Sequence, residues 1–497
     1  MLALLIAVSA SLARMAEAYI VSLLIALVLG SLMARNKVVE SIMLPVLDIL
    51  QSIPILGFFP AALAMFIANL PRALGVEAAA VFLIVTSLVW NMIFGVYASI
   101  KSLEPSVFDM ARVYSLGAVS RFFYIYVPAS RAALLANSLI SWAGGWFFLT
   151  AAEVITLGEE EYKLTGIGAF IMESYNRGDY ASFYIGVAAL FATIMATYVL
   201  LWNPAVKSVR DLPLPSVSAF YEKFSEVVSR VWSGLGEALV WVEARVKLPG
   251  FVPRVVGATL LVVALFYLGS GVAGLLSLDV VGVAKSFLHE LPLSLARVSI
   301  VLVFSLVLSL LIAYLTYSFR RAAMLIGASG ELLASVPAII WWPLLGYVAL
   351  TFSWGPLVVL FTVLLQGSLW YLYFNILVFG LGSIRKEHEE LAAVYGVKGW
   401  HFFRSIFFPS VFPSLLTGAL SSWGGAWNAT IAAEYVTLGQ RTIDLGGVGA
   451  LLNRYTVEGE AGKTALAALF LSLVIVAVDK AVWARLFSRL SGKFAGE

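Results

Sequence analysis

The chain has 497 residues, of which 61% are hydrophobic and 12% charged, whereas an ordinary soluble domain is about 25% charged. Apolar runs such as "AYIVSLLIALVLGSLMA" and "VSIVLVFSLVLSLLIAYL" approach the ~20 residues that a membrane-spanning helix needs. The composition therefore excludes a soluble globular protein and predicts an all-α polytopic membrane protein. A transmembrane β-barrel would show short alternating segments instead.

Charge and rare residue types exclude several kinds of site. The chain has no cysteine, so a disulfide, a thiol nucleophile and a thiolate metal site are impossible. Its three histidines (His289, His388 and His401) have no metal-ligand spacing, and a net charge of +3 gives no indication of nucleic-acid binding. "GKT" at 462–464 lacks the glycine and the strand of a phosphate loop. We expect no catalytic residues, no metal, no cofactor and no nucleic-acid partner.

Eleven apolar stretches follow one another along the chain. The opening "MLALLIAVSASLAR" lacks a basic segment, so we interpret it as the start of the first span rather than as a signal sequence. An extra stretch, "VVGATLLVVALFYLGSGVAGLL", occupies 255–276 between two groups of five. The groups lie near 15–34, 41–69, 75–98, 132–156 and 181–202, and near 296–318, 323–351, 354–380, 413–437 and 464–487. We therefore predict about 11 transmembrane helices.

The two groups of five are copies of one unit, as a test for internal repeats shows. "SLAR" at 11–14 recurs at 294–297, and "AAEVITLG" at 151–158 recurs as "AAEYVTLG" at 432–439. Trp, Gly and Pro residues between these motifs recur in the same register. We predict a first core at 1–202, a linker at 203–251, an extra transmembrane helix at 252–276 and a second core at 284–497.

The linker starts with the Pro-rich, charged segment "PAVKSVRDLPLPS", which predicts turns. It continues with apolar residues at helical spacing, while Glu222, Glu226, Arg230 and Glu237 lie on the other face. This pattern favours a helix on the inner membrane surface. We interpret it as a tether between the halves in preference to a regulatory element. The apolar positions are Phe220, Phe224, Val227, Val231, Leu235 and Leu239.

The extra span decides the relative orientation of the two cores. Five spans joined directly to five more would invert the second copy, as in many secondary transporters, but one added crossing makes the copies parallel. Placing the N-terminus outside and the C-terminus inside puts most of the 32 Lys and Arg residues in the cytoplasm, as the positive-inside rule requires.

Both cores contain one amphipathic segment on the predicted cytoplasmic side. These segments are "FDMARVYSLGAVSRFFYIYVPAS" at 108–130 and "EELAAVYGVKGWHFFRSIFFPS" at 389–410. In the second, acidic residues stand at a helix start and Gly396 permits a turn. We expect a second short helix with Trp400, Phe403, Ile406 and Phe407 available to the bilayer surface, ended by Pro409.

The second segment has Glu-x-Ala, a Gly six residues after the Glu and a Pro nineteen after it. This pattern resembles the EAA loop of ABC importer permeases. Met110 and Leu391 replace the middle Ala of the motif, and Ser115 stands where Gly is expected. "SIPILGFFP", "SVPAIIWWP" and "WGGAWNATIAAEYVTLG" are similar to the nitrate/sulfonate/taurine branch. The matching positions are Glu390, Ala392, Gly396 and Pro409 in the second copy, and Asp109, Ala111 and Pro128 in the first.

The resemblance implies an all-α permease in which two parallel five-helix cores are fused in one chain of a prokaryotic cell membrane. It implies two ABC ATPase subunits on the cytoplasmic side, an extracytoplasmic substrate-binding protein, and a small anion or small organic solute as substrate. ATP hydrolysis would occur on the separate subunits. The alternative is an ion-coupled secondary transporter, against which scarce buried carboxylates and parallel halves count. The implied ATPase-coupling residues are Asp109, Met110, Ala111, Ser115, Glu390, Leu391, Ala392 and Gly396.

Glu153 and Glu434 stand at equivalent positions late in apolar spans, where ionisable groups usually face the protein interior or a water-filled cavity. Either they gate the path, or they accept backbone hydrogen bonds at the span ends. We favour the second, because two carboxylates would repel an anion. We also expect them to approach each other across the pseudo-twofold axis. The candidate path residues are Trp146, Glu153, Trp427, Asn428 and Glu434, and Asn428 stands opposite Phe147 in the repeat.

Overall fold

The computed structural model describes most of both cores. The described residues are 2–52, 55–157, 160–202, 204–205, 218–245, 279–319, 325–327, 329–330, 333, 338–438, 441–483 and 485–486. The extra span expected at 255–276 lies outside them, as does the "SVP" of the second core. The extra span therefore stays a prediction.

The first core is a set of long helices interrupted by one protruding loop and one β-hairpin. The linker contributes a single long helix, α11 (Ser218–Arg245), as the apolar spacing predicts. The first-core elements are α1 (Leu2–Arg35), α2 (Lys37–Ser52), α3 (Ile55–Asn69), α4 (Arg72–Lys101), α5 (Pro105–Val113), α6 (Ala118–Arg121), the π-helical turn η1 (Phe122–Tyr126), α7 (Val127–Ala152), β1 (Val154–Leu157), β2 (Glu160–Lys163), α8 (Ile167–Asn176), α9 (Tyr180–Thr197) and η2 (Tyr198–Trp202).

The second core repeats this order, with more π-helical turns. Its first helix and α1 both begin well before the predicted spans, at Val280 and Leu2 instead of 296 and 15. The elements are α13 (Val280–Ser318), α15 (Ala338–Phe352), α16 (Gly355–Val363), η3 (Leu364–Ser368), α17 (Leu369–Asn375), η4 (Ile376–Gly380), η5 (Leu381–Ser383), α18 (Lys386–Val394), α19 (Gly399–Phe402), η6 (Phe403–Phe407), α20 (Phe408–Glu434), β3 (Tyr435–Leu438), β4 (Arg441–Asp444), α21 (Val448–Val457), α22 (Ala461–Val478) and η7 (Asp479–Trp483).

Seven helices in the described part of the chain are long and apolar enough to cross a membrane, and a bent pair within 118–152 makes up to eight. Of the span predicted at 41–69, the structure describes helix on both sides of residues 53 and 54, which lie outside the described part: α2 of 16 residues and α3 of 15. Of the span expected at 323–351, a continuous helix is described only as the 15-residue α15. The count of 11 spans stays a prediction.

Two β-hairpins follow the long helices α7 and α20, and the sequence analysis did not predict them. Val154 pairs with Lys163 in the first, and Tyr435 pairs with Asp444 in the second, both antiparallel. The spans expected to continue to 156 and 437 therefore end at Ala152 and Glu434. β-Branched residues just after each helix favour extended backbone.

The expectation that Pro409 ends a short helix is wrong. α19 continues through η6 into α20, so that Gly399–Glu434 forms one helix of 36 residues. Pro409 lies in the first turn of α20, where a missing backbone N–H leaves no helical hydrogen bond unmade. Pro128 has the same position in α7.

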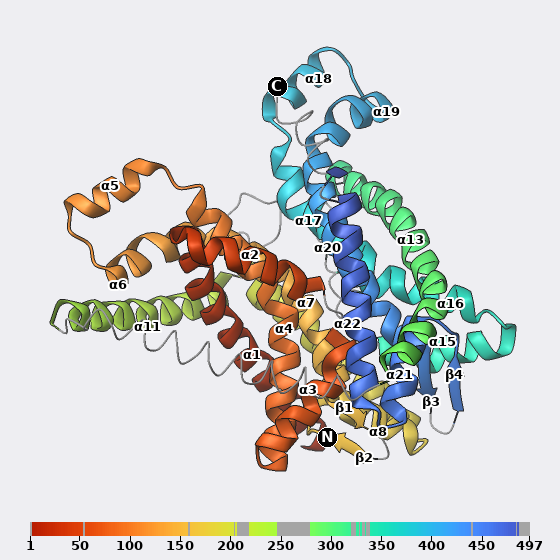
Figure 1. Ribbon diagram of the computed structural model, residues 1–497. Coiled ribbons are helices and arrows are strands. Elements are labelled where there is room, and N and C mark those ends of the chain that lie inside the picture. The colour runs from red at the N-terminus through yellow and green to blue at the C-terminus, as the bar shows by residue number, and fades with distance from the viewer. Residues whose placement is uncertain are drawn as a thin grey trace.

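The cores are parallel and share a buried interface. The hairpins β1–β2 and β3–β4 lie at one end of the molecule, while the α5–α6 and α18–α19 loops lie toward the other (Figure 1). Helix α3 of the first core packs against α20 and α22 of the second. One apolar cluster contains Phe59, Leu63 and Phe148 from the first core together with Trp427 and Leu471 from the second.

Candidate coupling loops and translocation path

The two protruding loops make the same turn. Gly396 has φ +65° and Ser115 has φ +49°, both in the left-handed region. The N–H of Leu116 donates to the Ala111 carbonyl at 2.9 Å, and the N–H of Val397 donates to the Ala392 carbonyl at 2.8 Å. The substitution of Ser for Gly thus keeps the turn, at a backbone cost of roughly 1 kcal/mol.

Each loop presents three exposed apolar side chains at equivalent positions, which we call the apolar triad. One Ala anchors each helix, because Ala111 and Ala392 are the only buried residues of α5 and α18. Exposed apolar groups on a protruding element are typical of a surface that contacts another protein or a membrane. The triads are Met110 (49% exposed), Val113 (81%) and Tyr114 (71%), and Leu391 (53%), Val394 (80%) and Tyr395 (78%).

The acidic motif residues of both loops lie at the surface. Glu390 is exposed, and its neighbour Glu389, which is half-buried, accepts a hydrogen bond from the Tyr317 hydroxyl. Asp109 forms an exposed ion pair of 2.9 Å with Arg112. The sequence motif therefore located the loops, while the triads were visible only as the repeated dipeptide Val-Tyr.

The second loop is held by aromatic side chains of its own core. The Tyr314 hydroxyl donates to the Gly399 carbonyl at 3.2 Å. Trp400 stacks on Phe403 with ring centroids 5.2 Å apart. Trp400 is 69% exposed, as expected for a side chain at the bilayer surface, but Phe407 is fully buried and packs against Tyr314. The expectation that Phe407 faces the bilayer is wrong.

The first loop is held by the linker helix α11. The Glu243 carboxylate accepts hydrogen bonds from the N–H of Val119 at 2.8 Å and of Ser120 at 3.1 Å, at the start of α6. The Phe123 ring lies 5.2 Å from the Trp232 ring. Burial raises the pKa of Glu243, but hydrogen bonds from Val119 and Ser120 outweigh it and hold the pKa below its ordinary value.

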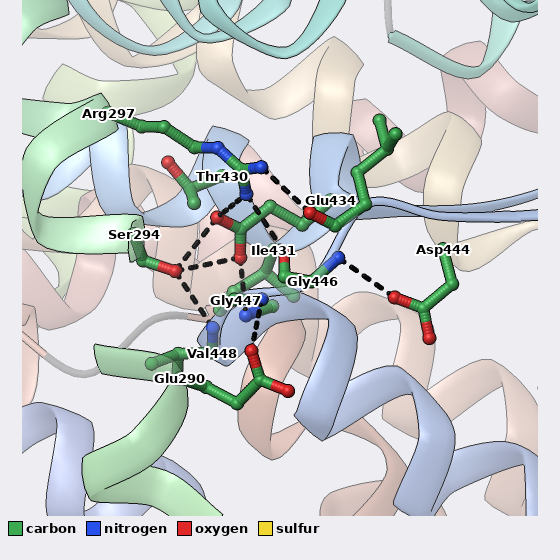
Figure 2. A network of polar contacts seen from close by, with 12 residues as sticks. Glu290, Ser294, Arg297, Thr430, Ile431, Glu434, Asp444, Gly446, Gly447 and Val448 are labelled. Carbon is green, nitrogen blue, oxygen red and sulfur yellow. Dashed lines mark hydrogen bonds and ion pairs between the residues drawn. The ribbon is translucent and has the colours of Figure 1, made fainter. Parts of the chain in front are cut away.

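At the other end of the second core, Glu434 lies in a buried polar cluster (Figure 2). Its carboxylate accepts hydrogen bonds from the Arg297 guanidinium at 2.6 Å and from the Ser294 hydroxyl at 2.8 Å. It also accepts the N–H of Gly449 at 2.8 Å, while the Ser294 hydroxyl accepts that of Val448 at 2.8 Å. Since Val448 and Gly449 begin α21, the cluster fixes the start of this helix to α13.

The residue before α21 is a glycine because the Glu434 carboxylate lies against its backbone. A Cβ on Gly447 would lie 2.3 Å from the Glu434 carboxylate oxygens, and φ at Gly447 is +105°. Only glycine permits this conformation beside a carboxylate.

The first core contains the equivalent cluster, in which the arginine pairs with two carboxylates. Glu153 accepts hydrogen bonds from Arg14 at 2.7 Å, Ser11 at 2.5 Å and the N–H of Gly168 at 2.7 Å. Arg14 also forms an ion pair of 2.8 Å with Glu77. Arg297 instead donates to the carbonyls of Gly446 and Leu445.

The described contacts hold Glu153 and Glu434 each within its own core, and they do not bond to one another. The expectation of a carboxylate pair across the axis is thus not supported, and the contacts favour bracing of the span ends. The partners of these two carboxylates, Arg14 and Arg297, were not predicted from the sequence. One signal was present: "SLAR" and "AAE" recur at nearly the same offset. This could have suggested that the arginine of the first motif pairs with the glutamate of the second in each core.

A small central cavity of ≈ 30 Å³ lies between the cores. Equivalent positions of α7 and α20 contribute Gly144 with Gly425 and Phe147 with Asn428. Asn428 also accepts the N–H of Ile55 at 2.6 Å, so it bonds directly across the interface. The remaining walls are Phe148, Ala429, Gln366, Ser368, Trp370, Tyr371 and Phe374.

Of the five candidate path residues, only Asn428 lines this cavity. Trp146 and Trp427 are fully buried and pack edge-on against Trp142 and Trp423. The neighbouring position, Phe147 in one core and Asn428 in the other, is the one that faces the cavity.

A duplicated bundle of apolar helices, with its two cores around a shared cavity and matching loops at one end, defines a membrane permease. The chain belongs to the family of binding-protein-dependent transport system inner membrane components, which matches residues 26–203 and again 305–489. The two matches cover most of both cores and confirm that two permease units are present in one chain.

Curated relatives resemble one core at a time. The nitrate import permease protein NrtB of Leptolyngbya laminosa is 25% identical over 197 residues, 39% of this chain and 66% of that protein. The bicarbonate transport system permease protein CmpB of Synechococcus elongatus is 25% identical over 199 residues, 39% of this chain and 67% of that protein. The CmpB of Synechocystis is 26% identical over 187 residues, 36% of this chain and 62% of that protein. The alignments thus span about two thirds of each relative's length.

Proposed function

We propose that this chain is the permease of an ATP-driven ABC importer, in which one polypeptide supplies both halves of the translocation path. The observation that carries the proposal is the pair of apolar triads, displayed on loops of equal geometry at the same end of two parallel cores. Two equivalent apolar triads on one side of the protein would bind two equivalent partners, such as two ATPase subunits. The chain itself hydrolyses no ATP.

The coupling role is assigned to the motif positions together with the triads. In the second loop Leu391, Val394 and Tyr395 would enter an apolar groove of an ATPase subunit, with Glu390 at the rim. In the first loop Met110, Val113 and Tyr114 would do the same, with Asp109 at the rim. Ala111, Ala392, Ser115 and Gly396 set the shape of the two loops.

The opposite end is the proposed docking face for an extracytoplasmic substrate-binding protein. Beside α13 and α21 lies a groove of ≈ 470 Å³ whose walls include Lys285, His289, Glu290 and Arg454. Arg454 is tied to Glu290 at 2.6 Å and to Asp444 at 2.6 Å, whereas Lys285 and His289 are exposed. The groove would receive an acidic element of the binding protein.

The proposed substrate is a small oxyanion of the kind that the relatives' names give, nitrate or bicarbonate. The similarity to NrtB and CmpB supports this class. None of the side chains that line the central cavity carries a charge, so no wall carboxylate would repel an anion there.

The decisive experiment measures recruitment of the ATPase subunit to membranes that hold the chain. Glu390→Lys and Tyr395→Asp, each alone and with Tyr114→Asp, should abolish recruitment and binding-protein-dependent uptake. Val457→Asp is the matched control for recruitment alone, because Val457 is 49% exposed at the opposite end, where the binding protein is proposed to dock. Normal recruitment by the loop variants, or an equal loss of recruitment in the control, would contradict the coupling role.

A further inference from the structure

The central cavity is asymmetric in a way that the repeat does not require. Gln366, Ser368 and Tyr371 of the second core line it. In the register of the repeat, their counterparts are Val85, Ser87 and Trp90, and these are absent from the described lining. The first core contributes Gly144, Phe147 and Phe148 instead. Polar wall groups thus come from the second core alone.

A local change of helix geometry accompanies this asymmetry. In the first core α4 is one continuous helix of 30 residues, but in the second the corresponding helix is interrupted by the π-helical turn η3. Such turns occur frequently at functional sites. Gly367 lies within this turn, and a Cβ there would be 2.6 Å from the Gly425 carbonyl oxygen. The turn therefore presses its backbone against α20 and brings Gln366 and Ser368 to the cavity.

The side-chain carbonyl oxygen of Gln366 is a buried hydrogen-bond acceptor without a donor among the described residues. Its amide nitrogen donates to the Leu333 carbonyl at 3.0 Å, which fixes the orientation of the carboxamide. Its Oε1 is buried and has no hydrogen-bond partner in the described part of the chain. A buried carbonyl oxygen without a partner is unfavourable, so this oxygen is available to a donor that enters the cavity.

Tyr371 presents a hydroxyl from the same wall. A Cβ on Gly144 would lie 3.4 Å from this hydroxyl, which shows that the side chain reaches across to the first core. A Cβ on Gly425 would lie 2.5 Å from its ring, so two glycines make room for it. The contacts found among the described residues give the hydroxyl no hydrogen-bond partner.

We infer that Gln366 and Tyr371 form a one-sided polar constriction that selects a solute carrying both a hydrogen-bond donor and an acceptor. This inference rests on the proposed function and narrows its substrate class. Of the two oxyanions named there, bicarbonate carries an O–H that can donate to Gln366, whereas nitrate has acceptors only. A cavity of ≈ 30 Å³ holds about one water, so the constriction is closed here and widens when solute passes.

The first test uses the absence of cysteine from the chain. Single variants Gln366→Cys and Tyr371→Cys are compared with Val85→Cys and Trp90→Cys in the full complex during ATP turnover. A small hydrophilic methanethiosulfonate should react at least tenfold faster at 366 and 371 than at 85 and 90. Equal rates in the two cores would overturn the one-sided constriction.

The second test measures uptake of labelled bicarbonate and labelled nitrate by the complex with one binding protein throughout. Gln366→Leu should slow bicarbonate uptake roughly three- to tenfold, the effect of one lost hydrogen bond, and leave nitrate uptake unchanged. Tyr371→Phe should slow both, because its hydroxyl donates to either anion. Ser87→Ala, which removes a hydroxyl from the first core, should slow neither.

The outcomes separate this inference from the proposed function. Equal slowing of both anions by Gln366→Leu, or no slowing of either, overturns the donor requirement while transport itself stands. If the unaltered complex moves neither anion, both the oxyanion class and its narrowing to bicarbonate fail, and the labelling rates still decide whether the constriction is one-sided.

Discussion

The carboxylate of Glu243 accepts a hydrogen bond from the backbone N–H of Ser120 at 3.1 Å and another from its hydroxyl at 3.1 Å. The two residues are separated by α7, the first hairpin, α8, α9 and most of the linker, yet this contact joins the linker helix α11 to the first protruding loop. A Cβ on Gly117 would lie 2.4 Å from the same carboxyl group. The repeat counterpart of Gly117 is Lys398, so the second core could not receive such a carboxylate in the same way.

Glu243→Gln should loosen the first loop. The carboxamide replaces one acceptor oxygen by a donor, which would face the backbone N–H groups of α6. Loss of charge-assisted bonds costs roughly 1–3 kcal/mol, so amide hydrogen exchange at 117–126 should accelerate about tenfold or more. Glu237→Gln is the control, because Glu237 is exposed on the same helix. Similar exchange in both variants would contradict the bracing role of α11.

The hydrogen bonds between Glu243 and the start of α6 should be lost at low pH and not at high pH. Hydrogen bonds lower the folded-state pKa of Glu243 below its ordinary value of 4.5. Its contribution is therefore complete above that pH and is lost as the pH falls through the folded-state pKa. Corrected for intrinsic exchange, protection at 117–126 should be constant from pH 8 to 5 and should fall below about pH 4.5, but not in Glu243→Gln. If protection at 117–126 were lost between pH 8 and 6 instead, the pH dependence would belong to a titratable group other than Glu243.

Ser115→Gly and Gly396→Ala should change the stability of their turns in opposite directions. Ser115 has φ +49°, so Ser115→Gly should stabilise its turn by about 1 kcal/mol. A Cβ on Gly396 would meet nothing within 4 Å, so Gly396→Ala should cost about 1 kcal/mol through backbone strain alone. Hydrogen exchange at Leu116 and Val397 measures both turns. A shift of the same sign in the two variants would exclude this account.

The large features of the fold were predictable because they depend on composition and repetition. Apolar runs predicted most of the long helices, and the repeat predicted an amphipathic segment at 108–130 and at 389–410. Their shared turn was not predicted, because Ser115 stands where Gly is expected. The hairpins after Ala152 and Glu434 were not predicted, since four-residue strands next to a long apolar run leave no distinct periodicity. Pro409 was misinterpreted because proline is tolerated in the first turn of a helix.

The site was only partly predictable, for a related reason. Charged residues such as Glu153 and Glu434 are conspicuous in apolar spans, but the sequence does not show which group bonds to them. Gln366 and Tyr371 are uncharged and lie within apolar segments, so nothing in the local pattern marks them. Their position depends on the π-helical turn η3 and on glycines of α20 that are distant in sequence.

Glu434→Gln should destabilise the protein more than Glu153→Gln. Arg14 keeps an ion pair with Glu77 when Glu153 is neutralised, whereas Arg297 is left with only the backbone carbonyls of Leu445 and Gly446 among its described partners. Breaking a buried ion pair costs roughly 3 kcal/mol or more, so we expect that loss at 434 and about half of it at 153. Thermal unfolding in detergent compares the two directly.

The same variants test bracing against gating. A bracing carboxylate predicts that folded Glu434→Gln transports at nearly the normal rate, with an unchanged profile between pH 5 and 8. Reconstituted uptake across that range is the measurement. A large loss of transport by a variant with normal thermal stability would establish a role in the path instead.

The two protruding loops should be accessible from one side of the membrane, and the two hairpin ends from the other. In the cysteine-free chain, Ser115→Cys and Gly396→Cys report the loops, while Arg177→Cys and Glu458→Cys report equivalent exposed positions at the ends of α8 and α21. An impermeant maleimide added to intact cells should label 177 and 458 at once. Positions 115 and 396 should react only after the membrane is opened, because parallel cores place both loops on one side and the surplus of Lys and Arg predicts that this side is the cytoplasm. Labelling of 115 and 396 from different sides would show inverted cores, and with them two ATPase subunits could not dock on one face.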